Sequence, residues 1–81
     1  MSDQIQRMLN RIDPQSSTFN ERHDALMNEA METGGTYAPR VEGHWLIDLH
    51  GVRVTGETED KAQRLWFRIA ATRTAIKEAT S

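Results

Sequence analysis

The chain has 81 residues and no cysteine, and its 12 acidic and 10 basic side chains leave a net charge of −2. A chain of this length forms one small domain that buries only about 60% of its unfolded surface, and without cysteine it has neither disulfides nor thiolate metal ligands. The acidic balance argues against a general nucleic-acid binder, and the lack of a long apolar run or a signal-peptide pattern predicts a cytoplasmic protein without a membrane span.

Residues 1–13 are predicted to form a short first helix. Large apolar residues recur there at helical spacing, at Ile5, Met8, Leu9 and Ile12. Pro14 ends the helix, because the residue before a proline avoids the α conformation. So short a helix is marginal alone, and we expect its apolar side to dock on the rest of the chain or on a second copy in a homodimer.

Residues 18–33 are predicted to form a second helix. Thr18 and Glu21 match a capping box, in which each side chain accepts a hydrogen bond from the other residue's backbone N–H. Gly34-Gly35 is a common signal for the end of a helix.

Residues 44–56 are predicted to form a β-hairpin with a two-residue turn at His50-Gly51. This turn would pair Leu49 with Val52, Ile47 with Val54 and Asp48 with Arg53. The apolar side chains then share one face, because side chains alternate faces along a strand. The preceding residues 36–43 are expected to be a loop or a short edge strand, since Pro39 cannot donate to a central ladder.

Residues 58–79 are predicted to form the last helix. Thr58 suits the N-cap, and Glu59 and Asp60 place negative charge where the helix dipole favours it. An apolar stripe at helical spacing is made by Ala62, Leu65, Trp66, Ile69 and Ile76. We expect this stripe to lie on the apolar face of the hairpin and to bury both tryptophans. The fold predicted for residues 1–81 is a single α+β domain of order α-α-β-β-α, a two-stranded antiparallel hairpin covered on one face by helices.

The last helix also carries a basic stripe of Lys61, Arg64 and Arg68. Such a stripe either follows phosphates or is the solvated side of an amphipathic helix. Phe67 is predicted to project almost opposite the apolar stripe, and an aromatic ring flanked by arginines has the composition of an interface anchor. We therefore expect these residues to contact a partner or a second copy of the chain.

The second helix offers an alternative interface that is acidic. Its candidate residues are Glu21, Asp24, Glu29 and Glu32. Acidic residues on a helix ordinarily serve solubility. The sharper alternative is a surface that occupies a nucleic-acid-binding groove on another protein, which electrostatic complementarity permits.

Neither a metal site nor an enzyme is expected. His44, Asp48 and His50 share one face of a strand, and side chains of these types bind divalent ions. Neighbours on that face are about 7 Å apart, and a fourth ligand such as His23 would have to come from far along the chain. There is no nucleophile motif and no glycine-rich phosphate loop, so no catalytic residue and no cofactor are predicted.

Two resemblances bear on function. The stretch Val54-Thr55-Gly56-Glu57-Thr58-Glu59-Asp60-Lys61-Ala62 resembles the strand-to-helix junction of HicB-type antitoxins, where a Gly-acid-Thr turn precedes an acidic helix start. In format, the whole chain resembles the small orphan proteins of phages and mobile elements, anti-CRISPR proteins among them. Such proteins are short single domains that act by binding, so this resemblance implies a Cas effector subunit as a partner.

The function expected from these features is non-enzymatic binding and inhibition of a host protein or ribonucleoprotein complex. The alternative is a nucleic-acid-binding or HicB-antitoxin-like regulatory protein that uses Arg53 together with the basic stripe. Phosphate binding weakens steeply with salt, so a DNA and RNA shift assay at two salt concentrations separates the two.

Overall fold

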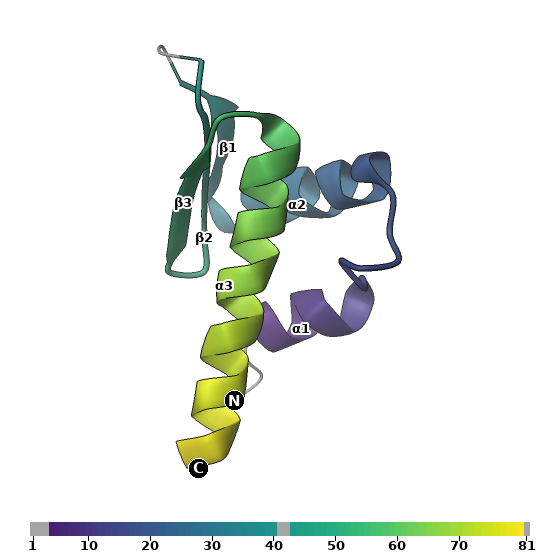
Figure 1. Ribbon diagram of the computed structural model, residues 1–81, viewed down its shortest axis with the longest axis vertical. Helices are drawn as coiled ribbons and strands as arrows, with labels where there is room; N and C mark the ends of the chain where they lie inside the picture. Colours follow the sequence, from purple (N-terminus) through teal and green to yellow (C-terminus); the bar gives the residue numbers. More distant parts are fainter. Residues whose placement is uncertain (1–3, 41–42, 81) are drawn as a thin grey trace.

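The computed structural model describes residues 4–40 and 43–80, and within them the chain folds into three helices and a three-stranded antiparallel sheet (Figure 1). In chain order the elements are α1 (Gln4–Arg11), α2 (Phe19–Thr33), β1 (Thr36–Pro39), β2 (Trp45–Leu49), β3 (Val52–Gly56) and α3 (Glu59–Thr80). The predicted α+β class is confirmed. The predicted two-stranded sheet is wrong, because a third strand, β1, pairs with β2. Residues 1–3 of the predicted first helix, and residues 41–42, lie outside the described residues.

The hairpin has the predicted register, with Leu49 opposite Val52, Ile47 opposite Val54 and Asp48 opposite Arg53. His50 and Gly51 have positive φ angles of 53° and 81°, as a type I′ turn requires. The carbonyl oxygen of Gly51 also accepts a hydrogen bond of 2.7 Å from Nη1 of Arg73 on α3. The turn is therefore fixed both by its own backbone and by a long side chain from the last helix.

Strand β1 extends the sheet on the free side of β2. Its Pro39 is tolerated because the strand order β1-β2-β3 places β1 at an edge. Tyr37 pairs with Ile47 and is 7% exposed. Its ring lies edge-to-face on Trp45, with 5.5 Å between the ring centroids. One large buried side chain thus anchors the short edge strand, which is one of the two alternatives predicted for residues 36–43.

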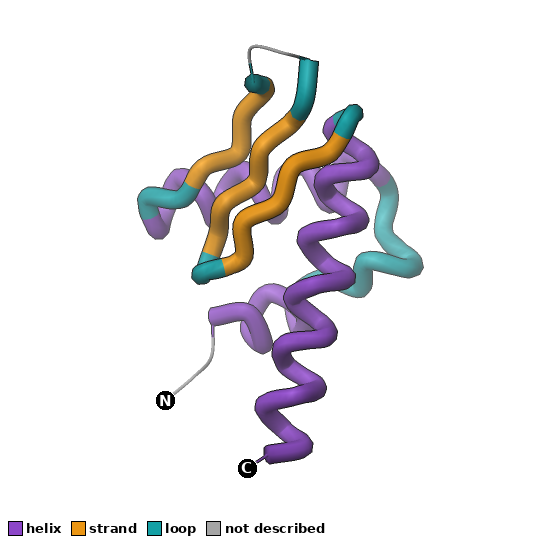
Figure 2. The backbone as a smooth tube through the Cα atoms, turned by 60° about the vertical axis from the view of Figure 1, so that its left-hand side comes forward, coloured by secondary structure: helices purple, strands orange, loops and turns teal. Residues whose placement is uncertain are grey.

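Helices α2 and α3 cover the same face of the sheet, as Figure 2 shows. Helix α3 packs on β3 and β2, and α2 packs on β1 and β2. Helix α1 lies against α3 near the turn of the hairpin, and the C-terminal part of α3 extends past the other elements (Figure 2). Along the described ranges, no helix combines the length and apolar character that crossing a membrane demands.

Two sides of α3 are buried. On the side that faces the sheet, Ala62 and Trp66 are fully buried. The burial of Trp66 is as predicted, whereas Trp45 is only partly buried, because it lies near the end of β2. On the side that faces α1, α2 and the loop between them, Gln63 and Phe67 are buried as well, with Phe67 only 2% exposed. The predicted exposure of Phe67 is therefore wrong, because the hairpin is not the only layer that covers α3. The predicted inward position of Ile76 is also wrong: this residue is 59% exposed, since α3 continues past its neighbours.

The first helix docks within the chain, as one of the two predicted outcomes had it. Ile5 and Met8 are buried in the core, and Leu9 and Ile12 pack against it partly buried. The helix ends at Arg11, two residues before the predicted end at residue 13.

Caps hold the two longer helices at their predicted ends. Thr18 and Glu21 form both hydrogen bonds of the capping box, and Gly34 ends α2 in the left-handed conformation, with φ 74°. At the start of α3, Oγ1 of Thr58 accepts a hydrogen bond of 3.1 Å from the backbone N–H of Lys61. Each of these contacts joins residues at most one helical turn apart.

Candidate functional site

A row of three cations, Lys61, Arg64 and Arg68, lies on the exposed side of α3 and is called here the basic ridge. Nε of Arg64 lies 2.9 Å from Asp60 Oδ2, and Nζ of Lys61 lies 3.1 Å from Glu57 Oε2. The two cationic side chains are 71% and 63% exposed, and exposed pairs of this kind hold weakly. The guanidinium of Arg68 contacts no acceptor among the described residues. The ridge therefore offers its cations to an external anion.

Two open hollows lie on either side of the ridge and share Arg64 and Arg68 in their walls. The first, called here the arginine hollow, has a volume of about 500 Å³ and is lined by Pro14, Gln15, Ser17, Arg22, Arg64, Phe67 and Arg68. The second has a volume of about 570 Å³ and is lined by His44, Thr55, Gly56, Glu57, Lys61, Arg64, Leu65 and Arg68. The ridge is thus the common wall of two concave surfaces.

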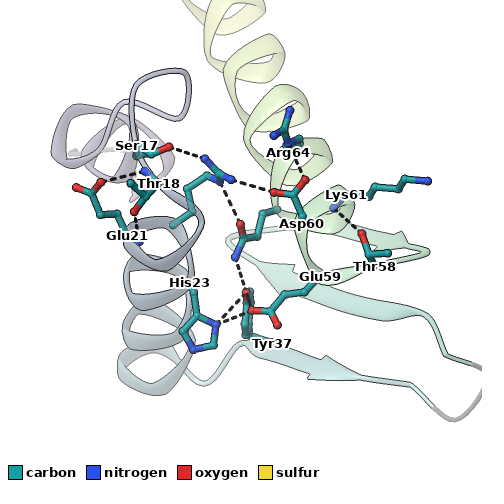
Figure 3. Close-up of polar contacts among 12 residues, drawn as sticks. Ser17, Thr18, Glu21, His23, Tyr37, Thr58, Glu59, Asp60, Lys61 and Arg64 are labelled. Atoms are coloured by element: carbon teal, nitrogen blue, oxygen red, sulfur yellow. Dashed lines mark hydrogen bonds and ion pairs between the residues drawn. The ribbon is translucent and has the colours of Figure 1, made fainter.

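A buried arginine forms part of the arginine hollow. Arg22, on the first turn and a half of α2, is 6% exposed. Its Nε donates to Gln63 at 3.1 Å, its Nη1 to the carbonyl oxygen of Ser17 at 2.7 Å, and its Nη2 to Asp60 at 3.0 Å (Figure 3). These three bonds fix the guanidinium in place, so its positive charge has a constant position beside the ridge.

The same network continues inward to the first strand. Gln63, fully buried, donates to the hydroxyl of Tyr37 at 2.8 Å, and this hydroxyl donates to Glu59 at 2.6 Å (Figure 3). Nδ1 of His23 lies 2.5 Å from the same oxygen of Glu59. Burial, and next the hydrogen bond to Glu59, raise the pKa of Tyr37. The phenol therefore keeps its proton at neutral pH, and the network joins α2, β1 and α3.

Sequence analysis missed this network, although α2 carries one signal of it. The residues that α2 buries fall at helical spacing, and they are Arg22, Ala25, Leu26, Glu29 and Ala30. Two charged residues at core positions of one helix indicate buried polar partners, because unpaired buried charges are costly. Nothing in the spacing of α3 singles out Gln63.

The acidic candidates on α2 do not form one surface. Asp24 and Glu32 are exposed, and Glu21 is exposed but engaged in the helix cap. Its hydrogen bond from the backbone N–H of Thr18 is the main cause that lowers the pKa of Glu21.

Glu29 departs from the predicted acidic surface, because it is 1% exposed. Its Oε1 pairs with Arg7 of α1 and lies 2.9 Å from Nε2 of His50 in the hairpin turn. The predicted exposure of Glu29 is therefore wrong: α1 and the hairpin close over this side of α2 and supply its partners.

The two strand histidines considered as metal ligands have different surroundings. His50 is directed to Glu29, and His44 lines the second hollow beside the ridge. Within residues 4–40 and 43–80, no three His, Asp or Glu side chains come together as a metal site would need.

Compared with protein-family models, with curated proteins and with solved structures, the chain gives no match.

Proposed function

We propose that this protein is a non-enzymatic binding protein that inhibits a host protein or ribonucleoprotein complex by docking its basic ridge on an acidic surface of the target. The observation that carries the proposal is the ridge itself: Lys61, Arg64 and Arg68 are exposed in a row on one helix, with open hollows on both sides. A convex row between two concave surfaces gives a partner both charge and shape to match.

The basic ridge is favoured over the acidic helix for a specific reason. Glu29 is buried and Glu21 caps its own helix, so only Asp24 and Glu32 of the four acidic candidates are exposed without such a role. The three cations of the ridge are all exposed, and Arg68 is held by no acceptor among the described residues. Arginine is also enriched at protein interfaces, where its planar fork pairs with carboxylates.

The target class follows from the resemblance to small phage proteins of the anti-CRISPR type, which makes a Cas effector subunit the first partner to test. The test uses guide-loaded effector complexes of several types, the wild-type chain and two double variants. Arg64→Glu with Arg68→Glu should abolish inhibition of target-DNA binding, because it replaces attraction by repulsion at the centre of the ridge. Asp24→Lys with Glu32→Lys should leave inhibition unchanged.

The opposite pattern would move the interface to the acidic helix. Melting curves of both variants serve as the control for folding, since all four positions are exposed. Absence of inhibition of any effector by the wild type overturns the proposal for this target class.

Nucleic-acid binding is the second candidate, because cations spaced along one helix can also follow a phosphate backbone. A shift assay with DNA and RNA at two salt concentrations decides between the two. Tight binding by the wild type with a steep salt dependence, together with no effect on any effector, would favour this candidate.

A further inference from the structure

The arginine hollow is a concave site that the ridge alone does not explain. Its three arginines come from two helices, Arg22 from α2 and Arg64 and Arg68 from α3, and Ser17 of the α1–α2 loop completes the wall. A volume of about 500 Å³ lies within the range of small-molecule sites.

Positive charge in this hollow exceeds what the neighbouring acid neutralises. Asp60 contacts two of the arginines, Arg22 through Oδ1 at 3.0 Å and Arg64 through Oδ2 at 2.9 Å. Arg68 contacts no acceptor among the described residues. Asp60 is the one carboxylate that the ion pairs of the described residues place against these three guanidinium groups, and Glu21 interacts with Arg22 through its charge alone. The hollow therefore keeps a net positive charge that an anion can neutralise.

Hydrogen-bond donors in the hollow are also left over. Nε of Arg64 pairs with Asp60, and the terminal nitrogens of Arg64 have no acceptor among the described residues. The hydroxyl of Ser17 is buried and has no hydrogen-bond partner in the described part of the chain. A buried hydroxyl without a partner is costly unless a ligand or water satisfies it. Arg64 and Arg68 thus line one concave surface with unused donors, and Ser17, whose covered hydroxyl also lacks a partner, lies in the same wall.

This donor set fits a tetrahedral oxyanion better than a carboxylate. A carboxylate is matched by one planar arginine fork, whereas a phosphoryl group has three outward oxygens for two forks and a hydroxyl. Arg22 adds a fixed charge that needs no rearrangement, because three bonds already hold it. We propose that the arginine hollow binds the phosphoryl group of a small phosphate monoester. The proposal does not rest on the inhibitor function, since it concerns a site that the chain presents on its own.

The test is an amide-resonance titration of the full chain at constant low ionic strength, with inorganic phosphate, adenosine 5′-monophosphate, adenosine and acetate as probes. We expect saturable shifts at Ser17, Arg64 and Arg68 with the two phosphates, and none with adenosine. Arg68→Gln and Ser17→Ala should each weaken phosphate binding by roughly tenfold or more, as loss of a hydrogen bond to a charged group does.

Arg53→Gln is the matched control, because Arg53 is also an exposed arginine, lies on β3 and does not line the hollow. Equal weakening by this control, or acetate binding as tight as phosphate, would show diffuse charge attraction and overturn the site. If DNA without a terminal phosphate binds while the monophosphate does not, the small-ligand proposal is likewise wrong. Ser17→Ala leaves every charge of the basic ridge in place, so it separates failure of this site from failure of the proposed function.

Discussion

Phe67→Ala distinguishes the structure from the sequence pattern more sharply than any other single change. Phe67 is 2% exposed and packs edge-to-face on Trp66, with 5.2 Å between ring centroids. Removing a buried phenylalanine costs about 3–5 kcal/mol. Because Phe67 also lines the open arginine hollow, water can enter the space it leaves, and we expect the lower end, about 3 kcal/mol. Chains of this size have a total stability of roughly 4–12 kcal/mol, so the variant should fold but melt about 12–24 °C lower.

The assay is thermal and urea unfolding followed by tryptophan fluorescence. Phe19→Ala is the matched control, since that ring is 38% exposed at the start of α2, and it should change stability by less than about 1 kcal/mol. If Phe67→Ala melts with the wild type, the ring lies on the surface, the two-sided burial of α3 is refuted, and an anchor role for Phe67 returns.

Three further predictions test the contacts that close the fold. Glu29→Gln should lower the free energy of unfolding by about 1–3 kcal/mol, because it weakens the buried contacts of this side chain with Arg7 and His50. Glu32→Gln, on the exposed side of α2, should change the free energy of unfolding by less than about 0.5 kcal/mol. Equal effects of the two variants in urea unfolding would contradict the buried pairing. Deleting residues 1–13 should lower the urea midpoint, since it uncovers the core that α1 closes, and an unchanged midpoint would show that α1 contributes nothing to the monomer. Burial raises the pKa of Tyr37, so the stability it contributes is complete below the ordinary tyrosine value of 10.0 and is lost as pH rises above it. Tyr37→Phe should remove this alkaline loss, and because the chain has a single tyrosine, near-ultraviolet titration follows that group alone.

Helix ends and the hairpin were predictable because their determinants are local. The capping box joins Thr18 to Glu21, three residues away, and the hairpin register follows from a two-residue turn at His50. Contacts this close in sequence form in much the same way whatever the rest of the chain does. The predicted boundaries of α2 and α3 accordingly lie within one residue of those observed.

The number of layers around α3 was not predictable in this way. The sequence of α3 shows one apolar stripe, and a single stripe predicts a single covering layer, which leaves Phe67 exposed to solvent. In the structure α1, α2 and the loop between them form a second layer over the neighbouring side of α3, and they bury Phe67 and Gln63 together. Hydrophobic periodicity counts the polar residue Gln63 as exposed. Phe67 is then the single large apolar residue on that side of α3, and the pattern does not indicate a second buried surface.

The polar contacts around the hollow depend on residues far apart in the chain. Arg22 bonds to Gln63 across 41 positions and to Asp60 across 38, and no local rule selects such partners. The sequence of α2 does indicate that such partners exist, since Arg22 and Glu29 lie at the same helical spacing as the core residues around them. Because a buried charge without a partner is costly, a charged residue at a core position of an amphipathic helix predicts that a polar network exists. Its members are then determined by which elements the fold places opposite that helix.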